Sequence, residues 1–151
     1  IRDHCVTGVQ TCALPIWDEG ADHIDVWGTG CASREFLFVR DAAEGIVLAA
    51  DRYSKPDPVN LGAGQEITIR HLAEMIGAMC GFRGRLQFDH SKPDGQPRRC
   101  LDTSRAHAEF GFRAKTQFRD GLAETIAWME KELHHQPAPH SDGSNLCFPV
   151  H

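Results

Sequence analysis

The pattern of apolar residues predicts four helices along the chain, and three of them have a signal for their start or their end. Asp41 followed by Glu44 forms a capping-box pattern, which predicts the start of a helix. Thr68 is placed to cap a second apolar-faced helix that ends at Gly81, and Gly111 is a stop signal for a third. The predicted helices span residues 41–52, 69–80, 103–109 and 117–133.

Short β-prone segments separate these helices. The alternation of polar and apolar residues is clearest in RLQFD, at Arg85–Asp89, where it predicts a half-buried strand. The other predicted strands are Ile24–Trp27, Glu35–Val39 and Val59–Leu61. Strands that alternate with helices indicate an α/β fold, but so few strands do not make a self-sufficient sheet.

Composition excludes several classes of function. The 151-residue chain has a net charge of -5 and no basic run, which argues against nucleic acid or an anionic membrane surface as a partner. No apolar stretch approaches the length of a membrane span. The cysteines show no C-x-x-C pair and no disulfide-framework spacing, which is typical of reduced thiols in a cytoplasmic protein.

The first sixteen residues, IRDHCVTGVQTCALPI, carry a different kind of signal. Back-translation of residues 1–3 and 6–16 gives the two constant parts of a common sequencing-library adapter, and His4-Cys5 fills the index position between them. We therefore interpret residues 1–17 as adapter-derived and exclude them from the fold. Residues 18–133 form the predicted functional region, and residues 134–151 are expected to be a disordered tail.

Common catalytic and cofactor motifs are missing from the chain. A short-chain dehydrogenase needs a Tyr-x-x-x-Lys pair, but the only tyrosine is Tyr53, and Asp57 follows it at that spacing. The Gly62–Gly64 turn suggests a dinucleotide fingerprint, but Ile67 stands where a third glycine is needed, so the two glycines are interpreted as turn residues.

Two predicted loops instead gather residues suited to a phosphate and a sugar. Arginine offers a planar fork for phosphate oxygens, tryptophan offers a flat stacking face, and a loop aspartate accepts from hydroxyl groups. The candidates are Trp27, Arg34, Lys92, Asp94 and Arg98. Residue types alone favour a structural interpretation, with core packing of Trp27, a surface charge at Arg34 and turn chemistry at Pro93-Asp94-Gly95.

Longer stretches strengthen the functional interpretation. WGTGCASREFLFVRDAAEGI, the KPDGQPR loop at Lys92–Arg98 and FRDGLAETIAWM resemble the C-terminal part of the GDP-L-fucose synthase family, within the extended short-chain dehydrogenases/reductases. The resemblance covers about residues 24–133. It implies that Trp27, Arg34 and Asp94 contact a GDP-sugar, and that Lys92 and Arg98 add positive potential or shape the loop.

The resemblance also implies what the chain does not contain. Full-length relatives use NADP(H) and are expected to be homodimers, and their catalytic groups and glycine-rich cofactor turn lie upstream of residue 18. The predicted helix over 41–52 is apolar nearly all round, and with the strand at Val59–Leu61 it would complete the nucleotide-binding Rossmann sheet. Without that sheet, we expect the piece to be marginally stable.

Two alternatives stay open at this point. The chain is a piece of another nucleotide-sugar epimerase or dehydratase, or it is a non-catalytic module that recruits a metal or a partner. The second alternative depends on the tail, whose candidate ligands are His134, His135, His140, Cys147 and His151.

Overall fold

The computed structural model describes residues 22–135. The adapter interpretation of residues 1–17 and the greater part of the predicted tail therefore lie outside the described residues. Helix α5 extends to His135, so the first two residues assigned to the tail lie at the end of this helix.

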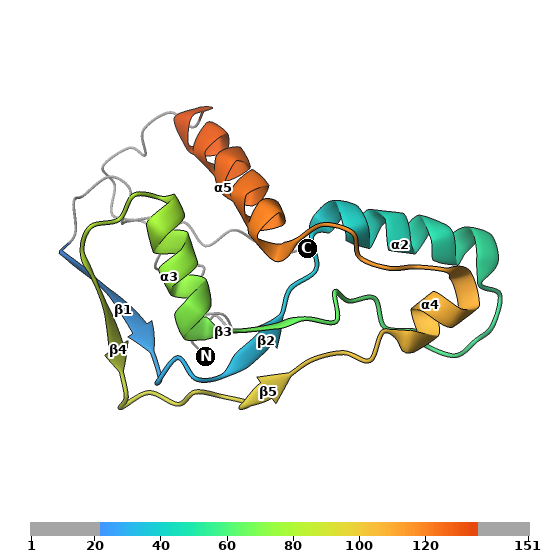
Figure 1. Cartoon of the computed structure of the whole chain (residues 1–151), viewed down its shortest axis with the longest axis horizontal. Helices are drawn as coiled ribbons and strands as arrows, with labels where there is room; N and C mark the ends of the chain where they lie inside the picture. Colours follow the sequence, from blue (N-terminus) through green and yellow to red (C-terminus); the bar gives the residue numbers. More distant parts are fainter. Residues whose placement is uncertain (1–21, 136–151) are drawn as a thin grey trace, which may run out of the picture.

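Two small sheets form the β structure of the described residues (Figure 1). In the first, β1 (His23–Trp27) pairs in parallel with β4 (Arg85–Asp89), and His23 lies opposite Arg85. In the second, β2 (Ser33–Glu35) is the central strand. It pairs antiparallel with β3 (Glu66–Thr68) and parallel with β5 (Arg98–Arg99).

The helices have the local signals that the sequence predicts. Helix α3 (Ile69–Met79) is capped by Thr68, whose hydroxyl oxygen accepts a hydrogen bond from the amide of His71. Helix α4 (Ser104–Phe110) ends at Gly111, which has a φ of 77° and so adopts the left-handed conformation that favours glycine. Helices α2 (Val39–Arg52) and α5 (Phe118–His135) complete the helices of residues 22–135.

A buried apolar cluster lies where α2 meets α4, at one end of an elongated molecule (Figure 1). Ala106, Phe110 and Phe112 are buried at its centre, and Tyr53 packs its ring against Phe110 with the ring centres 5.7 Å apart. Gly45 permits the close approach of α2, because a Cβ there would lie 2.9 Å from the Phe112 ring. This cluster fixes α2 beside the segment that leaves α4.

Three predicted features are wrong in detail. Val59–Leu61 is not a strand; Val59 and Leu61 pack as extended chain against the apolar cluster. The strand expected at Glu35–Val39 is instead Ser33–Glu35, because the residues after Glu35 turn into α2. The predicted capping box is absent: α2 begins at Val39 after Phe38, with no side-chain cap.

Asp41 has a longer-range role than a cap. It is 5% exposed and accepts hydrogen bonds from the backbone amides of Lys115 and Thr116 and from the Thr116 hydroxyl. Because a buried carboxylate needs such donors, the sequence signal at Asp41 reflects a tertiary contact between α2 and the segment before α5.

Helix α2 is also less enclosed than its all-round apolar pattern predicts. Val39, Ile46 and Val47 are each more than half exposed, and Asp41 and Gly45 are its buried residues. Helices of this pattern normally pack on most of their circumference. Within residues 22–135, no helix is both long and apolar enough to span a bilayer.

We predict that Asp41→Ala lowers the free energy of unfolding by about 1–3 kcal/mol, because it leaves two backbone amides and a hydroxyl without their acceptor. Urea unfolding followed by circular dichroism measures the change. Glu124→Ala is the control, since Glu124 pairs with Arg40 at the surface and such pairs contribute under about 1 kcal/mol. Equal losses in the two variants would contradict the role given to Asp41.

Candidate functional site

Trp27 lies at the end of β1, immediately before a tight turn at Gly28–Gly30. Gly28 and Gly30 have φ values of 83° and 75°, which residues with a Cβ rarely adopt. The amide of Gly28 donates to the carbonyl of Asp89, which joins the turn to the end of β4. Trp27 itself is 57% exposed, so its ring is available to a ligand rather than serving as core filler.

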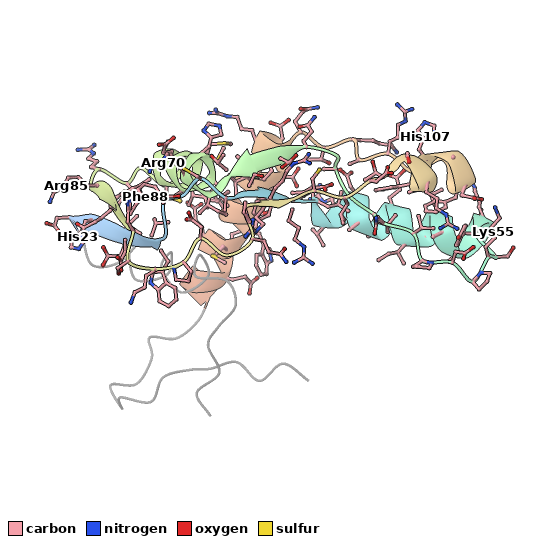
Figure 2. All side chains as sticks on the ribbon, turned by 90° about the horizontal axis from the view of Figure 1, so that it is seen from below. His23, Lys55, Arg70, Arg85, Phe88 and His107 are labelled. Atoms are coloured by element: carbon pink, nitrogen blue, oxygen red, sulfur yellow. The ribbon has the colours of Figure 1, made fainter. Side chains whose placement is uncertain are left out.

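Arg70, from α3, also contacts this turn, and Figure 2 shows it beside Phe88 of β4. Its guanidinium lies 3.7 Å from the centre of the Phe88 ring, and its Nη2 donates to the carbonyl of Thr29 at 2.8 Å. A Cβ on Gly30 would lie 3.0 Å from Cβ of Arg70 and overlap the Phe88 ring. The turn that follows Trp27 is therefore fixed by packing as well as by hydrogen bonds.

Asp94 closes the turn from the loop between β4 and β5. Its Oδ1 accepts from the Thr29 amide at 2.6 Å, and its Oδ2 accepts from the Thr29 hydroxyl at 2.7 Å. A Cβ on Gly28 would overlap Oδ1, so the glycine is required for this approach. The hydrogen bonds from the Thr29 side chain and backbone hold the pKa of Asp94 below its ordinary value.

Lys92 comes from the same loop and lies over Trp27. Its Nζ is 5.6 Å from the centre of the Trp27 ring, which is within the range of a cation–π contact. The structure therefore brings Trp27, Lys92 and Asp94 together, although Asp94 bonds to the chain itself through both carboxylate oxygens.

Arg34 lies on the central strand β2, where it lines a surface pocket of about 270 Å³ with Glu35, Arg99 and Leu101. Its Nη1 donates to the carbonyls of Ser33 and Gln96, at 2.6 and 2.7 Å. Among residues 22–135, no hydrogen bond engages its other guanidinium nitrogens. The bond to Gln96 also joins the pocket to the loop that carries Lys92 and Asp94.

Arg99 is the register partner of Arg34 in the β2–β5 pairing. Directly opposed residues on neighbouring strands point to the same face, and both arginines line this pocket. Arg99 is not among the residues that the sequence predicted for the site. The sequence signal that points to Arg99 is the doublet Arg98-Arg99. Adjacent strand residues point to opposite faces, so the two arginines of a doublet in a strand have different environments.

Arg98 has a different environment from Arg99. Its Nε and Nη2 both donate to the carboxylate of Glu66 on β3, and the Ser33 hydroxyl donates to the same group. These bonds engage the fork of Arg98 within the sheet. The roles expected for Arg98 at the site, adding positive potential or shaping the loop, stay predictions.

The Gly62–Gly64 turn does not fit a dinucleotide. The amide of Gly64 donates to Oε1 of Glu35, and a Cβ on Gly62 would overlap that same oxygen. A pyrophosphate needs those amides free, and a carboxylate would repel it. Ile67, in the third position of the pattern, lies in β3 rather than at a helix start.

Tyr53 likewise has a structural role. Its hydroxyl donates to the carbonyl of Asp57 at 2.8 Å and accepts from Arg105 at 3.1 Å. Across residues 22–135, no group of three or more His, Cys, Asp or Glu side chains is arranged to hold a metal ion. His140, Cys147 and His151 of the tail lie outside the described residues.

Comparison with known proteins defines the class first. The model of the NAD-dependent epimerase/dehydratase family matches residues 7–62, a range that begins inside the segment interpreted as adapter. The crystal structure of a GDP-L-fucose synthetase from Naegleria fowleri superposes with a TM-score of 0.76 and 25% identity, over 85% of this chain and 39% of that one. The chain belongs to the NAD-dependent epimerase/dehydratase family.

Within this family, the chain is similar to GDP-L-fucose synthases, which confirms the resemblance. It is 47% identical to GDP-L-fucose synthase 1 of Arabidopsis thaliana over 76% of this chain and 35% of that protein. It is 39% identical to GDP-L-fucose synthase of Escherichia coli strain K12 over 73% of this chain and 37% of that protein. The chain thus spans about a third of the length of these relatives.

The Asp94–Thr29 bonds lead to a prediction about pH. A carboxylate with a lowered pKa stabilises the fold above its unfolded-state pKa, and this contribution is lost as the pH falls through the folded value. We expect the carboxyl carbon of Asp94 to titrate below the ordinary pH of an aspartate in NMR spectra, and Thr29→Val to move that midpoint upward. Thr29→Ser, which keeps the hydroxyl, is the control. The same midpoint in all three proteins would show that Thr29 does not hold Asp94.

Proposed function

We propose that the chain is a piece of a GDP-L-fucose synthase. Such an enzyme is the NADPH-dependent 3,5-epimerase and 4-reductase that converts GDP-4-dehydro-6-deoxy-D-mannose to GDP-L-fucose. The identity to GDP-L-fucose synthases from a plant and a bacterium supports this assignment over other nucleotide-sugar epimerases and dehydratases.

In this proposal, the described residues bind the GDP-sugar. The carrying observation is the pocket that Arg34 and Arg99 both line as register partners, because two arginines on one face suit the neighbouring phosphates of a diphosphate. Trp27 offers its exposed ring to a flat face of the ligand, and Lys92 adds positive charge beside it. Asp94 holds the turn through Thr29 and is the candidate acceptor for a substrate hydroxyl or amide.

NADP(H) is the proposed cofactor of the complete enzyme, and a structure of the Naegleria fowleri synthetase has NADP bound. The turn at Gly62–Gly64 does not fit it, since Glu35 accepts from Gly64 and fills the space beside Gly62. We assign no catalytic step to residues of this chain and propose that alone it is inactive. The complete enzyme is proposed to be a cytoplasmic homodimer that binds neither nucleic acid nor membrane.

We expect Arg34→Ala and Arg99→Ala each to weaken GDP binding to the 151-residue chain by about tenfold, as measured by isothermal titration calorimetry. Each substitution removes charge-assisted hydrogen bonds to phosphate, and a tenfold change corresponds to about 1.4 kcal/mol. Arg83→Ala is the matched control, because Arg83 lies outside the pocket. Undiminished GDP affinity in both pocket variants, or tighter binding of UDP than of GDP, would contradict the proposal.

A further inference from the structure

Glu35 follows Arg34 on β2 and joins three parts of the described chain. Its Oε1 accepts from the amide of Gly64 at 2.7 Å, and its Oε2 accepts from the amide of Leu101 at 2.6 Å. Partial burial alone would raise the pKa of Glu35, but the hydrogen bonds from Leu101 and Gly64 outweigh it and hold the pKa below its ordinary value. Glu35 is therefore a charged acceptor for two backbone segments.

The segment around Arg99 has few other attachments. Strand β5 comprises two residues, Arg98 and Arg99, and a strand of this length has too few backbone hydrogen bonds to be stable by itself. On one side of Arg99, the carbonyl of Pro97 accepts from Ser33, and Arg98 pairs with Glu66. On the other side, the chain returns to β2 through Glu35, which accepts from the Leu101 amide and also from the Cys100 side chain.

Gly62 provides independent evidence that the carboxylate of Glu35 is closely packed against the Gly62–Gly64 turn. A Cβ on Gly62 would overlap Oε1 of Glu35 and lie 3.1 Å from Cγ2 of Thr103. Gly62 is buried and has no positive φ, so the need for glycine there comes from the space that Glu35 fills rather than from backbone strain.

We propose that Glu35 is a positioning residue for the arginine pocket. It holds the backbone after Arg99 and the Gly62–Gly64 turn against β2, and so keeps Arg99 beside Arg34. Glu35 acts through Arg99 and does not itself bind the ligand. This inference rests on the proposed binding of a diphosphate between the two arginines.

The direction of the expected effect separates positioning from simple electrostatics. A negative charge beside an anion site weakens anion binding, so removing that charge would by itself strengthen binding of a phosphate. Loss of positioning instead predicts that binding of a phosphate becomes weaker. In Glu35→Gln, one of the two amide donors faces an NH₂ group, and the contact to Leu101 or to Gly64 is lost.

The test compares GDP and GMP binding to the 151-residue chain and its variants by isothermal titration calorimetry. The ratio of the two affinities measures the contribution of the second phosphate, which a general loss of fold does not change selectively. We expect Glu35→Gln to reduce this ratio by about fivefold or more. Gly62→Ala, which displaces the carboxylate while leaving Glu35 charged, is expected to reduce it similarly.

Asp102→Asn is the matched control. Asp102 adjoins Leu101, its carboxylate accepts from the backbone amide of Ser104, and its removal changes the charge by the same amount. We expect it to leave the GDP to GMP ratio unchanged. An unchanged or increased ratio in Glu35→Gln would overturn the positioning role, as would an equal decrease in the control. If the parent chain does not prefer GDP to GMP, the proposed function itself fails.

Discussion

The pairing of β2 with strands on both of its sides is the constraint on which the candidate site depends. Ser33–Glu35 pairs with β3 on one side and with β5 on the other, and these strands come from distant parts of the chain. The β2–β5 register places Arg34 opposite Arg99. Because the strands are short, side-chain bonds support the pairing: Glu66 binds Arg98 and Ser33, and Glu35 binds Leu101. Without this pairing, the two arginines would lie on unconnected segments.

The carboxylates and the cationic groups of the site have separate roles. Glu35, Glu66 and Asp94 all accept hydrogen bonds from this chain, and the donors that surround them hold their pKa values below the ordinary range. Arg34 and Arg99 line the open pocket, and Lys92 lies over the exposed Trp27. The acidic residues therefore build the loops, while the cationic and aromatic groups are left for a ligand. In the proposed function, this arrangement lets an acidic chain present a local site for an anion.

Local signals were predictable from the sequence, and tertiary pairing was not. The Thr68 cap, the Gly111 stop and the alternation at Arg85–Asp89 each involve neighbouring residues, and the structure confirms them. Strands β3 and β5 are too short for a periodicity to show, and their residues become strands through contact with β2. Asp41 fits the sequence pattern of a capping box, but in the structure it accepts a hydrogen bond from the Thr116 amide. Only the β2–β5 register shows that Arg99, and not Arg98, lies opposite Arg34. The resemblance supplied Trp27, Arg34 and Asp94, whereas the bonds that place Glu35 and Thr29 required coordinates.

The central claim is that Arg34 and Arg99 form one anion site, while Arg98 is part of the framework. Nitrogen-15 NMR of the arginine Nε–H groups during a titration with GDP tests it most directly. The account predicts that the signals of Arg34 and Arg99 shift together and saturate at the same GDP concentration, while those of Arg98 and Arg83 stay in place. Shifts confined to arginines outside the pocket, such as Arg119, or separate saturation of Arg34 and Arg99, would contradict it.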